Sequence, residues 1–356
     1  MATIKEQTEK TERLKTTLDN KVNSIGNIIN TKIKEKPATL TQVEDALKRK
    51  MLGIGDIVTD LQIEELGYPT DGNGIFTGHT EYVQALTIDN EYIYSGGGDN
   101  TVRKIRKSDM VEVGVFTGHT NTVNALAIDD GFIYSGSYDR TVRKIRKSDM
   151  VEVGVFTGHN RAVWSLTIDD GFIYSGSNDN TVRKIRKSDM VEVGKFTGHN
   201  NYVYELTIDD GFIYSSGSDN TVRKIRKSDM VEVGRFTGHT NNVQALTIDN
   251  EYIYSGSNDD TVRKIRKSDM VEVGVFTGHN SAVWSLTIDD GYIYSGSYDN
   301  TVRKIRKSDM VEVGVFTGHT NTVNALAIDN EFIYSGSSDN TVRKWAKNKL
   351  YKILYI

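Results

Sequence analysis

The sequence predicts an all-β fold, a seven-bladed β-propeller of four-stranded antiparallel blades, preceded by an N-terminal α-helical segment. Three observations lead to this prediction. The tripeptide Thr-Gly-His recurs seven times at a spacing of 40 residues, each unit contains four short β-rich segments, and no unit has a helical period. A four-stranded sheet cannot bury both of its faces alone, whereas a closed ring of such sheets can.

The first unit shows the four expected strands in chain order. They are residues 83–88, 92–95, 101–106 and 111–116, separated by turns at 89–91, 96–100 and 107–109. The turns are rich in Gly, Asn, Asp and Ser, and the segments between them are rich in Val, Ile and Tyr. The other six units repeat this pattern, so residues 74–356 are predicted to form one propeller.

The repeats resemble the WD-repeat family. Gly78-His79, Asp99 and the run Thr-Val-Arg-Lys-Ile at 101–105 match the family layout. The resemblance implies a hydrogen-bonded His, Ser, Asp and Trp chain inside each blade, such as His119, Ser135 and Asp139. Isoleucine replaces the tryptophan in six units and only Trp345 keeps it, so six blades are expected to hold a shortened chain. The implied structural positions are His79, Asp99, His119, Asp139, His159, Asp179, His199, Asp219, His239, Asp259, His279, Asp299, His319 and Asp339.

The region before the repeats, residues 1–70, is predicted to be a helical anchor for self-association or docking. Leu14, Leu18, Val22, Ile25 and Ile29 recur at helical spacing within residues 4–35, and Pro37 ends that helix. A capping box at 41–44 opens a second helix toward residue 51, and a third short helix is expected at 57–66. The opening residues are similar to the start of tail-fibre-like proteins from phages of Gram-positive bacteria.

Two segments compete for the outer strand of the seventh blade. Residues 350–356 align without gaps to 310–316, and residues 74–76 align to the end of the same strand. Because Asp71-Gly72-Asn73 is poor strand material, we expect residues 319–356 to build this blade alone.

The repeats differ mainly at three places: the two positions flanking the first-strand valine and the position before the turn aspartate. In a four-stranded meander these positions gather at one end of the ring, called here the top face. Their aromatic and amide side chains suit a neutral, hydroxyl-rich ligand such as a surface glycan, or a peptide. The predicted ligand-binding residues are Tyr82, Gln84, Asn124, Tyr138, Trp164, Asn178, Tyr202, Tyr204, Gln244, Asn258, Trp284, Tyr298 and Asn324. Drift at unconstrained surface positions is the alternative reading.

Composition argues against several functions. The net charge is −4, there is no cysteine, and no run of 18 apolar residues occurs, so we expect no nucleic-acid partner and no membrane insertion. The first residues carry no apolar run, so no signal peptide is expected. All seven histidines are Gly-His residues, one per blade, which are too far apart to share a metal ion. We therefore expect no metal, no cofactor and no catalytic residue.

The sequence is interpreted as a non-enzymatic binding protein. The preferred setting is a phage tail or tail-like particle, whose propeller recognises a bacterial surface ligand while the N-terminal helix contacts other protein chains. An intracellular, cytoplasmic protein–protein scaffold is the first alternative. An engineered or recently amplified repeat propeller is the second.

Overall fold

The structure is a computed structural model that describes residues 61–67, 74–347 and 350–355. Its contacts divide the chain into two units. One is Tyr68–Lys347, and the other combines Met1–Gly67 with Asn348–Ile356. The predicted helices at 4–35 and 41–51 lie outside the described residues.

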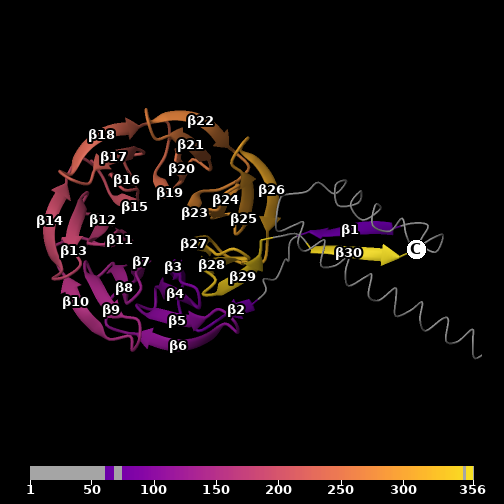
Figure 1. The fold of residues 1–356 in the computed structure, drawn as a ribbon, viewed down its shortest axis with the longest axis horizontal. Helices are drawn as coiled ribbons and strands as arrows, with labels where there is room; N and C mark the ends of the chain where they lie inside the picture. The colour runs from indigo at the N-terminus through magenta and orange to yellow at the C-terminus, as the bar shows by residue number, and fades with distance from the viewer. Residues whose placement is uncertain (1–60, 68–73, 348–349, 356) are drawn as a thin grey trace, which may run out of the picture. The chain divides into compact units, whose positions relative to one another are not determined.

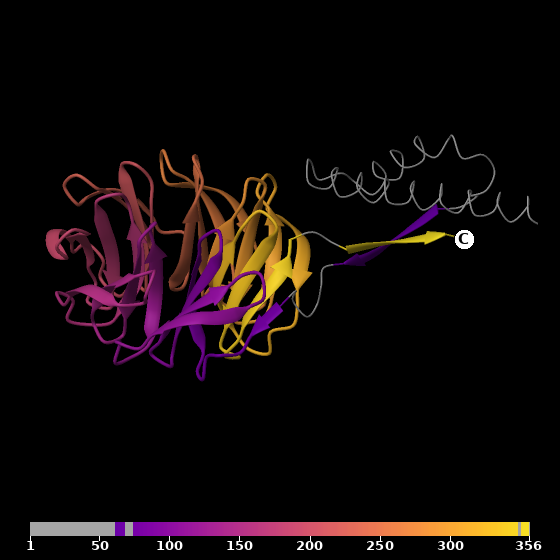
Figure 2. The same ribbon diagram turned by 60° about the horizontal axis from the view of Figure 1, so that its bottom comes forward.

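The larger unit is a β-propeller of seven four-stranded antiparallel sheets, as predicted. The sheets follow one another around a ring, and the inner strand of the seventh blade packs beside that of the first (Figure 1). Loops project from both ends of the ring (Figure 2). We call the end that carries the loops before the inner strands the top face, and the other end the bottom face.

Each blade contributes one strand to each of four concentric positions. The inner strands, which surround the axis, are β3 (Val83–Ile88), β7 (Val123–Ile128), β11 (Val163–Ile168), β15 (Val203–Ile208), β19 (Val243–Ile248), β23 (Val283–Ile288) and β27 (Val323–Ile328). The second strands are β4 (Tyr92–Gly97), β8 (Phe132–Ser137), β12 (Phe172–Ser177), β16 (Phe212–Gly217), β20 (Tyr252–Ser257), β24 (Tyr292–Ser297) and β28 (Phe332–Ser337). The third strands are β5 (Val102–Arg106), β9 (Val142–Arg146), β13 (Val182–Arg186), β17 (Val222–Arg226), β21 (Val262–Arg266), β25 (Val302–Arg306) and β29 (Val342–Ala346). The outer strands are β6 (Val111–Phe116), β10 (Glu152–Phe156), β14 (Val191–Phe196), β18 (Val231–Phe236), β22 (Val271–Phe276), β26 (Val311–Phe316) and β2 (Gly74–Phe76).

The hydrophobic core lies between neighbouring blades. A typical cluster joins Tyr94, Val102 and Phe116 of the first blade to Val123 and Ile133 of the second. The second strands are buried on both faces, which explains their continuous apolar and small-residue composition. The repeated faces of adjacent sheets therefore bury each other, and ring closure removes the last exposed face.

The seventh blade closes with the N-terminal segment, so the prediction that residues 319–356 build it alone was wrong. β2 pairs with β29 in the register Gly74↔Lys344 and Phe76↔Val342. The physical reason is the glycine: a Cβ on Gly74 would come within 2.8 Å of the Met110 side chain in the first blade. Outer strands repeat this contact, as between Gly114 and Met150. The C-terminal segment would have placed Leu354 at that position.

The C-terminal segment instead pairs with residues before the propeller. β30 (Leu350–Tyr355) and β1 (Leu61–Gly67) form a two-stranded antiparallel sheet in which Ile63 faces Ile353. The third predicted helix, at 57–66, was therefore wrong over residues 61–66. The apolar and charged residues of that segment have a partner strand available from the far end of the chain, which local pattern could not show. The larger unit of contacts accordingly ends at Lys347.

Candidate functional site: the top face and the central channel

A His–Ser–Asp network ties the top-face loops of every blade to its sheet. In the second blade, His119 Nδ1 lies 2.7 Å from Asp139 Oδ2 and His119 Nε2 lies 2.7 Å from Ser135 Oγ. The same two contacts recur in all seven blades. Trp345 Nε1 donates to Ser335 Oγ at 2.7 Å in the seventh blade only. The shortened chain expected for the six other blades is confirmed.

The network is built to hold charge in a fixed place. Burial raises the pKa of Asp139, but hydrogen bonds from His119 and Thr141 outweigh it and hold that pKa well below its usual range. Burial lowers the pKa of His159, against the raising effect of Asp179, and so favours the neutral imidazole. The His–Ser–Asp network has the same buried geometry in every blade, so these residues position the loops. The serine of one blade has no surroundings that distinguish it as a nucleophile from the serines of the others.

A β-bulge in each inner strand leaves one variable residue without a partner residue on the second strand. In the third blade, Val163 pairs with Ser177 and Ser165 with Gly176, so Trp164 is the extra residue between them. Such a bulge re-aims the side chain that it leaves without a partner residue. The resulting central channel has a volume of about 160 Å³. Five of the predicted residues line it: Gln84, Asn124, Trp164, Trp284 and Asn324.

The structure brings several predicted aromatic residues together in one cluster. The ring of Trp164 lies edge-on to Tyr138, with centroids 6.1 Å apart, and to Tyr204, with centroids 5.6 Å apart. Tyr202 packs against Tyr204 at 6.3 Å. These four residues span the second, third and fourth blades, and we call them the aromatic cluster. The equivalent Trp284 contacts Tyr298 of its own blade, at 6.3 Å.

The two tryptophans offer little open surface, although small residues, Ala162 and Ala282, lie two positions before them. Both are partly buried, and in the part of the chain that the structure describes neither indole nitrogen has a hydrogen-bond partner. The aromatic surface that faces solvent consists of tyrosines instead. Tyr298 is 57% exposed, Tyr138 is 47% exposed and Tyr82 is 36% exposed.

Some predicted ligand-binding residues hold the blades together. The Nδ2 atoms of Asn124 and Asn324 donate to the backbone carbonyl groups of Val163 and Val83 in the following blade, each at 2.9 Å. The hydroxyl of Tyr82 lies 3.1 Å from Thr122 Oγ1 in the next blade.

The remaining four amides vary in their surroundings. Gln84 is partly buried and lines the channel, whereas Gln244 is buried. Asn178 and Asn258 follow their second strands, and the buried Oδ1 of each has no partner among the described side chains and backbone. The top face therefore combines structural amides with unsatisfied ones.

The bottom face carries an inter-blade clamp that the sequence alone did not reveal. Lys147 Nζ of the second blade lies 3.0 Å from Asp89 Oδ2 of the first, and Lys104 Nζ of the first donates to the Lys147 carbonyl. Asp89 also accepts the hydroxyl of Tyr94 and the backbone N–H of Tyr92. All seven blade junctions repeat the lysine–aspartate pair. The invariance of these lysines thus has a structural cause.

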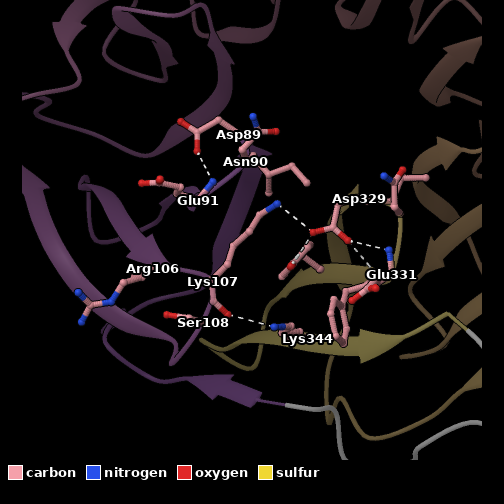
Figure 3. Close-up of a pocket in the computed structure, with 14 residues that line it drawn as sticks. Asp89, Asn90, Glu91, Arg106, Lys107, Ser108, Asp329, Glu331 and Lys344 are labelled. Carbon is pink, nitrogen blue, oxygen red and sulfur yellow. Dashed lines mark hydrogen bonds and ion pairs between the residues drawn. The ribbon is translucent and has the colours of Figure 1, made fainter. Parts of the chain in front are cut away.

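The junction that closes the ring has the same clamp beside a cavity of about 780 Å³. Figure 3 shows Lys107 of the first blade extending to Asp329 of the seventh, at 2.9 Å, while Lys344 donates to the Lys107 carbonyl at 3.0 Å. These contacts reproduce the clamp of the other junctions. The polar contacts beside this cavity are therefore structural ones, and they do not set its lining residues apart from those of the other blade junctions.

One residue of the channel wall, Glu205, was not predicted from the sequence. Its position is alanine in four blades and serine in two, at Ser165 and Ser285. This fourth variable position was detectable in the repeats, but its orientation toward the axis depends on the bulge. Glu205 Oε1 accepts hydrogen bonds from Ser165 Oγ at 2.6 Å and from the Leu206 backbone at 3.0 Å.

Within the described ranges there is no group of three or more His, Asp or Glu side chains placed to hold a metal ion. Across those same ranges, no helix combines the length and the apolar character needed to span a bilayer.

The fold and its repeated network define a repeat protein of the β-propeller class. The family model for the WD domain, G-beta repeat, matches residues 73–104, 110–144, 150–184, 190–224, 230–264, 270–304 and 310–346. The chain belongs to this WD40 repeat family. No curated protein matches it. Among solved structures, it is similar to the WD40 β-propeller domain of Doa1, with 24% identity and a TM-score of 0.72, over 79% of this chain and 97% of that one. That similarity concerns the fold alone.

Proposed function

We propose that this protein is a non-enzymatic binding module whose top face holds a protein ligand. The observation that carries the proposal is the aromatic cluster, which joins three blades beside the channel and leaves Tyr138 half exposed. Tyrosine and tryptophan are the residues that most often anchor protein interfaces, since each buries a large area at a small entropy cost. Membership of the WD40 repeat family supports the same role.

A surface glycan is the second candidate ligand. The exposed rings of Tyr138 and Tyr298, with the unsatisfied amide oxygens of Asn178 and Asn258, offer stacking surfaces and acceptors to a sugar. This candidate accompanies the proposal of a phage tail component that binds a bacterial surface ligand. The protein ligand accompanies the intracellular scaffold. The proposed docking helix at residues 4–35 lies outside the described residues and supports neither ligand.

Two parallel selections on the full chain test the proposal and separate its candidates. A random peptide display library and an array of bacterial surface glycans would be probed with the wild type, with Tyr138→Ala, and with Val193→Ala as the matched control. Val193 is exposed on the outer strand β14, away from the top face. We expect enriched peptides that bind the control and lose at least tenfold in affinity with Tyr138→Ala. Glycan binders with that pattern would favour the second candidate. Binders that are insensitive to Tyr138→Ala would contradict the top-face proposal.

A further inference from the structure

The wall of the central channel carries one acidic side chain. Inner-strand residues of all seven blades line the channel, and they are Ala, Leu, Ser, Asn, Gln and Trp apart from Glu205. Neighbouring strands add no charge. The only ionisable side chains on β11, β12, β16 and β19 are Tyr174 and Tyr214, whose hydroxyls donate to Asp169 and Asp209 on the bottom face. A negative charge on Glu205 therefore has no counter-ion among the described residues.

The surroundings of Glu205 are partly prepared to hold that charge. Ser165 Oγ donates to Oε1, and Ser165 Oγ in turn accepts the Leu206 backbone N–H at 2.8 Å. Across the strand pair, Glu205 faces Ser216, whose buried hydroxyl has no partner among the described residues. Ser216 replaces the glycine found at this position of the other six blades. The second carboxylate oxygen, Oε2, accepts no hydrogen bond from any described group.

Comparison with the sixth blade shows that this arrangement is specific to one junction. The third and sixth blades share the sequence Val-Trp-Ser-Leu. Ser165 of the third blade has Glu205 at the equivalent position of the next blade, whereas Ser285 of the sixth blade has Ala325 there. Ser285 Oγ is accordingly buried without a partner. The scaffold therefore accepts alanine at this position, and the carboxylate is not needed to build a blade.

We propose that Glu205 is a cation-binding position within the channel, which receives the primary ammonium group of a lysine side chain from the protein bound on the top face. A compact ammonium ion suits a carboxylate with one free oxygen better than a guanidinium, whose planar fork needs both oxygens. The inference rests on the proposed function, because the top-face ligand delivers the lysine.

The electrostatics give this site a pH dependence. Burial raises the pKa of Glu205 to about 7, against the lowering effect of the hydrogen bonds from Ser165 and Leu206. Only the ionised carboxylate attracts an ammonium group. Binding should therefore strengthen as the pH rises through 7, and by linkage a bound ammonium ion should lower the pKa of Glu205.

The test uses the full chain with carbon-13 in the glutamate carboxyl groups, and n-butylammonium chloride as the probe. Glu205→Gln identifies the Glu205 resonance, and Glu205→Ala, which restores the residue of four other blades, is the control for folding. At about 100 mM probe we expect the apparent pKa of Glu205 to fall by roughly half a unit, while n-butanol leaves it unchanged. An unchanged titration with both probes, or an equal shift with both, would overturn the site.

A second measurement separates this inference from the proposed function. Lysine-containing peptides selected on the top face should bind about tenfold more tightly at pH 8 than at pH 6, and Glu205→Gln should abolish that difference. Peptides that need Tyr138 but bind equally at both pH values and to Glu205→Gln would refute the cation site alone. Installing the carboxylate in the seventh blade with Ala325→Glu should create a second butylammonium-sensitive resonance beside Ser285.

Discussion

The two ends of the propeller are built from the same repeat and yet differ in how their polar groups are used. On the bottom face every lysine–aspartate pair is made, and each aspartate also accepts bonds from its own turn and a neighbouring tyrosine. On the top face the His–Ser–Asp network is complete, but the side chains above it vary, and several of their buried polar atoms have no partner among the described residues. Buried polar groups without partners cost free energy. The difference indicates that the polar groups of the bottom face stabilise the fold. Those of the top face do not maximise stability, as expected for the proposed ligand-binding face.

The largest effect should follow from breaking one bottom clamp. Asp169→Ala removes the acceptor for Lys227 Nζ, the Tyr174 hydroxyl and the backbone N–H groups of Gly171 and Phe172. Because Lys227 and Tyr174 are left largely buried, we expect a loss of about 2–4 kcal/mol in the free energy of unfolding by urea. Asp170→Ala, at the exposed neighbouring position of the same turn, should change it by less than about 0.5 kcal/mol. Equal effects of the two variants would refute the clamp.

The matched tryptophans give the next largest effect. Trp164 packs against tyrosines of two other blades, whereas Trp284 contacts one tyrosine of its own blade. Trp164→Ala should therefore lower the free energy of unfolding by about 1–3 kcal/mol, and by more than Trp284→Ala does. Thermal unfolding of both variants decides this. A larger loss from Trp284→Ala would contradict the role of the aromatic cluster in joining blades.

Acid should destabilise the propeller in two stages. The pKa values of His159, His199 and His319 are lowered by burial, so the unfolded chain binds protons more readily as the pH falls below 6.5. The network aspartates such as Asp179 have pKa values held below their usual range, chiefly by the bonds that outweigh their burial, so their contribution is lost below about pH 4. Melting temperatures from pH 8 to pH 3 should decline in both windows. A melting temperature that rises with acid would contradict the assignment of neutral histidines.

The smallest effects concern two serines in identical sequence contexts. Ser165→Ala removes the donor to Glu205 and should lower the free energy of unfolding by about 1 kcal/mol. Ser285→Ala removes a hydroxyl that has no partner among the described residues, and it should be neutral or slightly stabilising. Differential scanning calorimetry of the pair measures this contrast. Equal losses would show that Ser285 has a partner of its own.

The sequence predicted the repeat and the four strands of each blade, because each depends on residues close together in one unit. The resemblance to the WD-repeat family implied the His–Ser–Asp network. Other features depended on contacts between units. Lys147 and Asp89 are 58 residues apart in the sequence. Their pairing could be predicted only from the distance between adjacent blades. Ring closure was missed although Gly74 and Phe76 match the glycine and phenylalanine of the other outer strands. The steric demand for glycine beside Met110 appears only once two blades pack together.

The candidate site was predicted as a set of positions but not as an arrangement. The variable residues were placed on one face. Strand register determines the bulge that points Trp164 toward the axis. It also determines the hydrogen bonds by which Asn124 and Asn324 join neighbouring blades. Glu205 was not among the predicted residues. Its isolation in the channel follows from what the other six blades place there.

The most direct test of the account measures binding and stability on the same samples. Tyr138→Ala with Tyr298→Ala removes the two most exposed top-face tyrosines, and Asp169→Ala removes a bottom clamp. We predict that the double variant loses at least tenfold in affinity for a selected top-face ligand and keeps its melting temperature within about 2 °C. Asp169→Ala should lower the melting temperature, and at temperatures where this variant is folded it should bind the ligand as tightly as the wild type does. A double variant that unfolds early, or that binds as tightly as the wild type, would contradict the division between a binding face and a structural one.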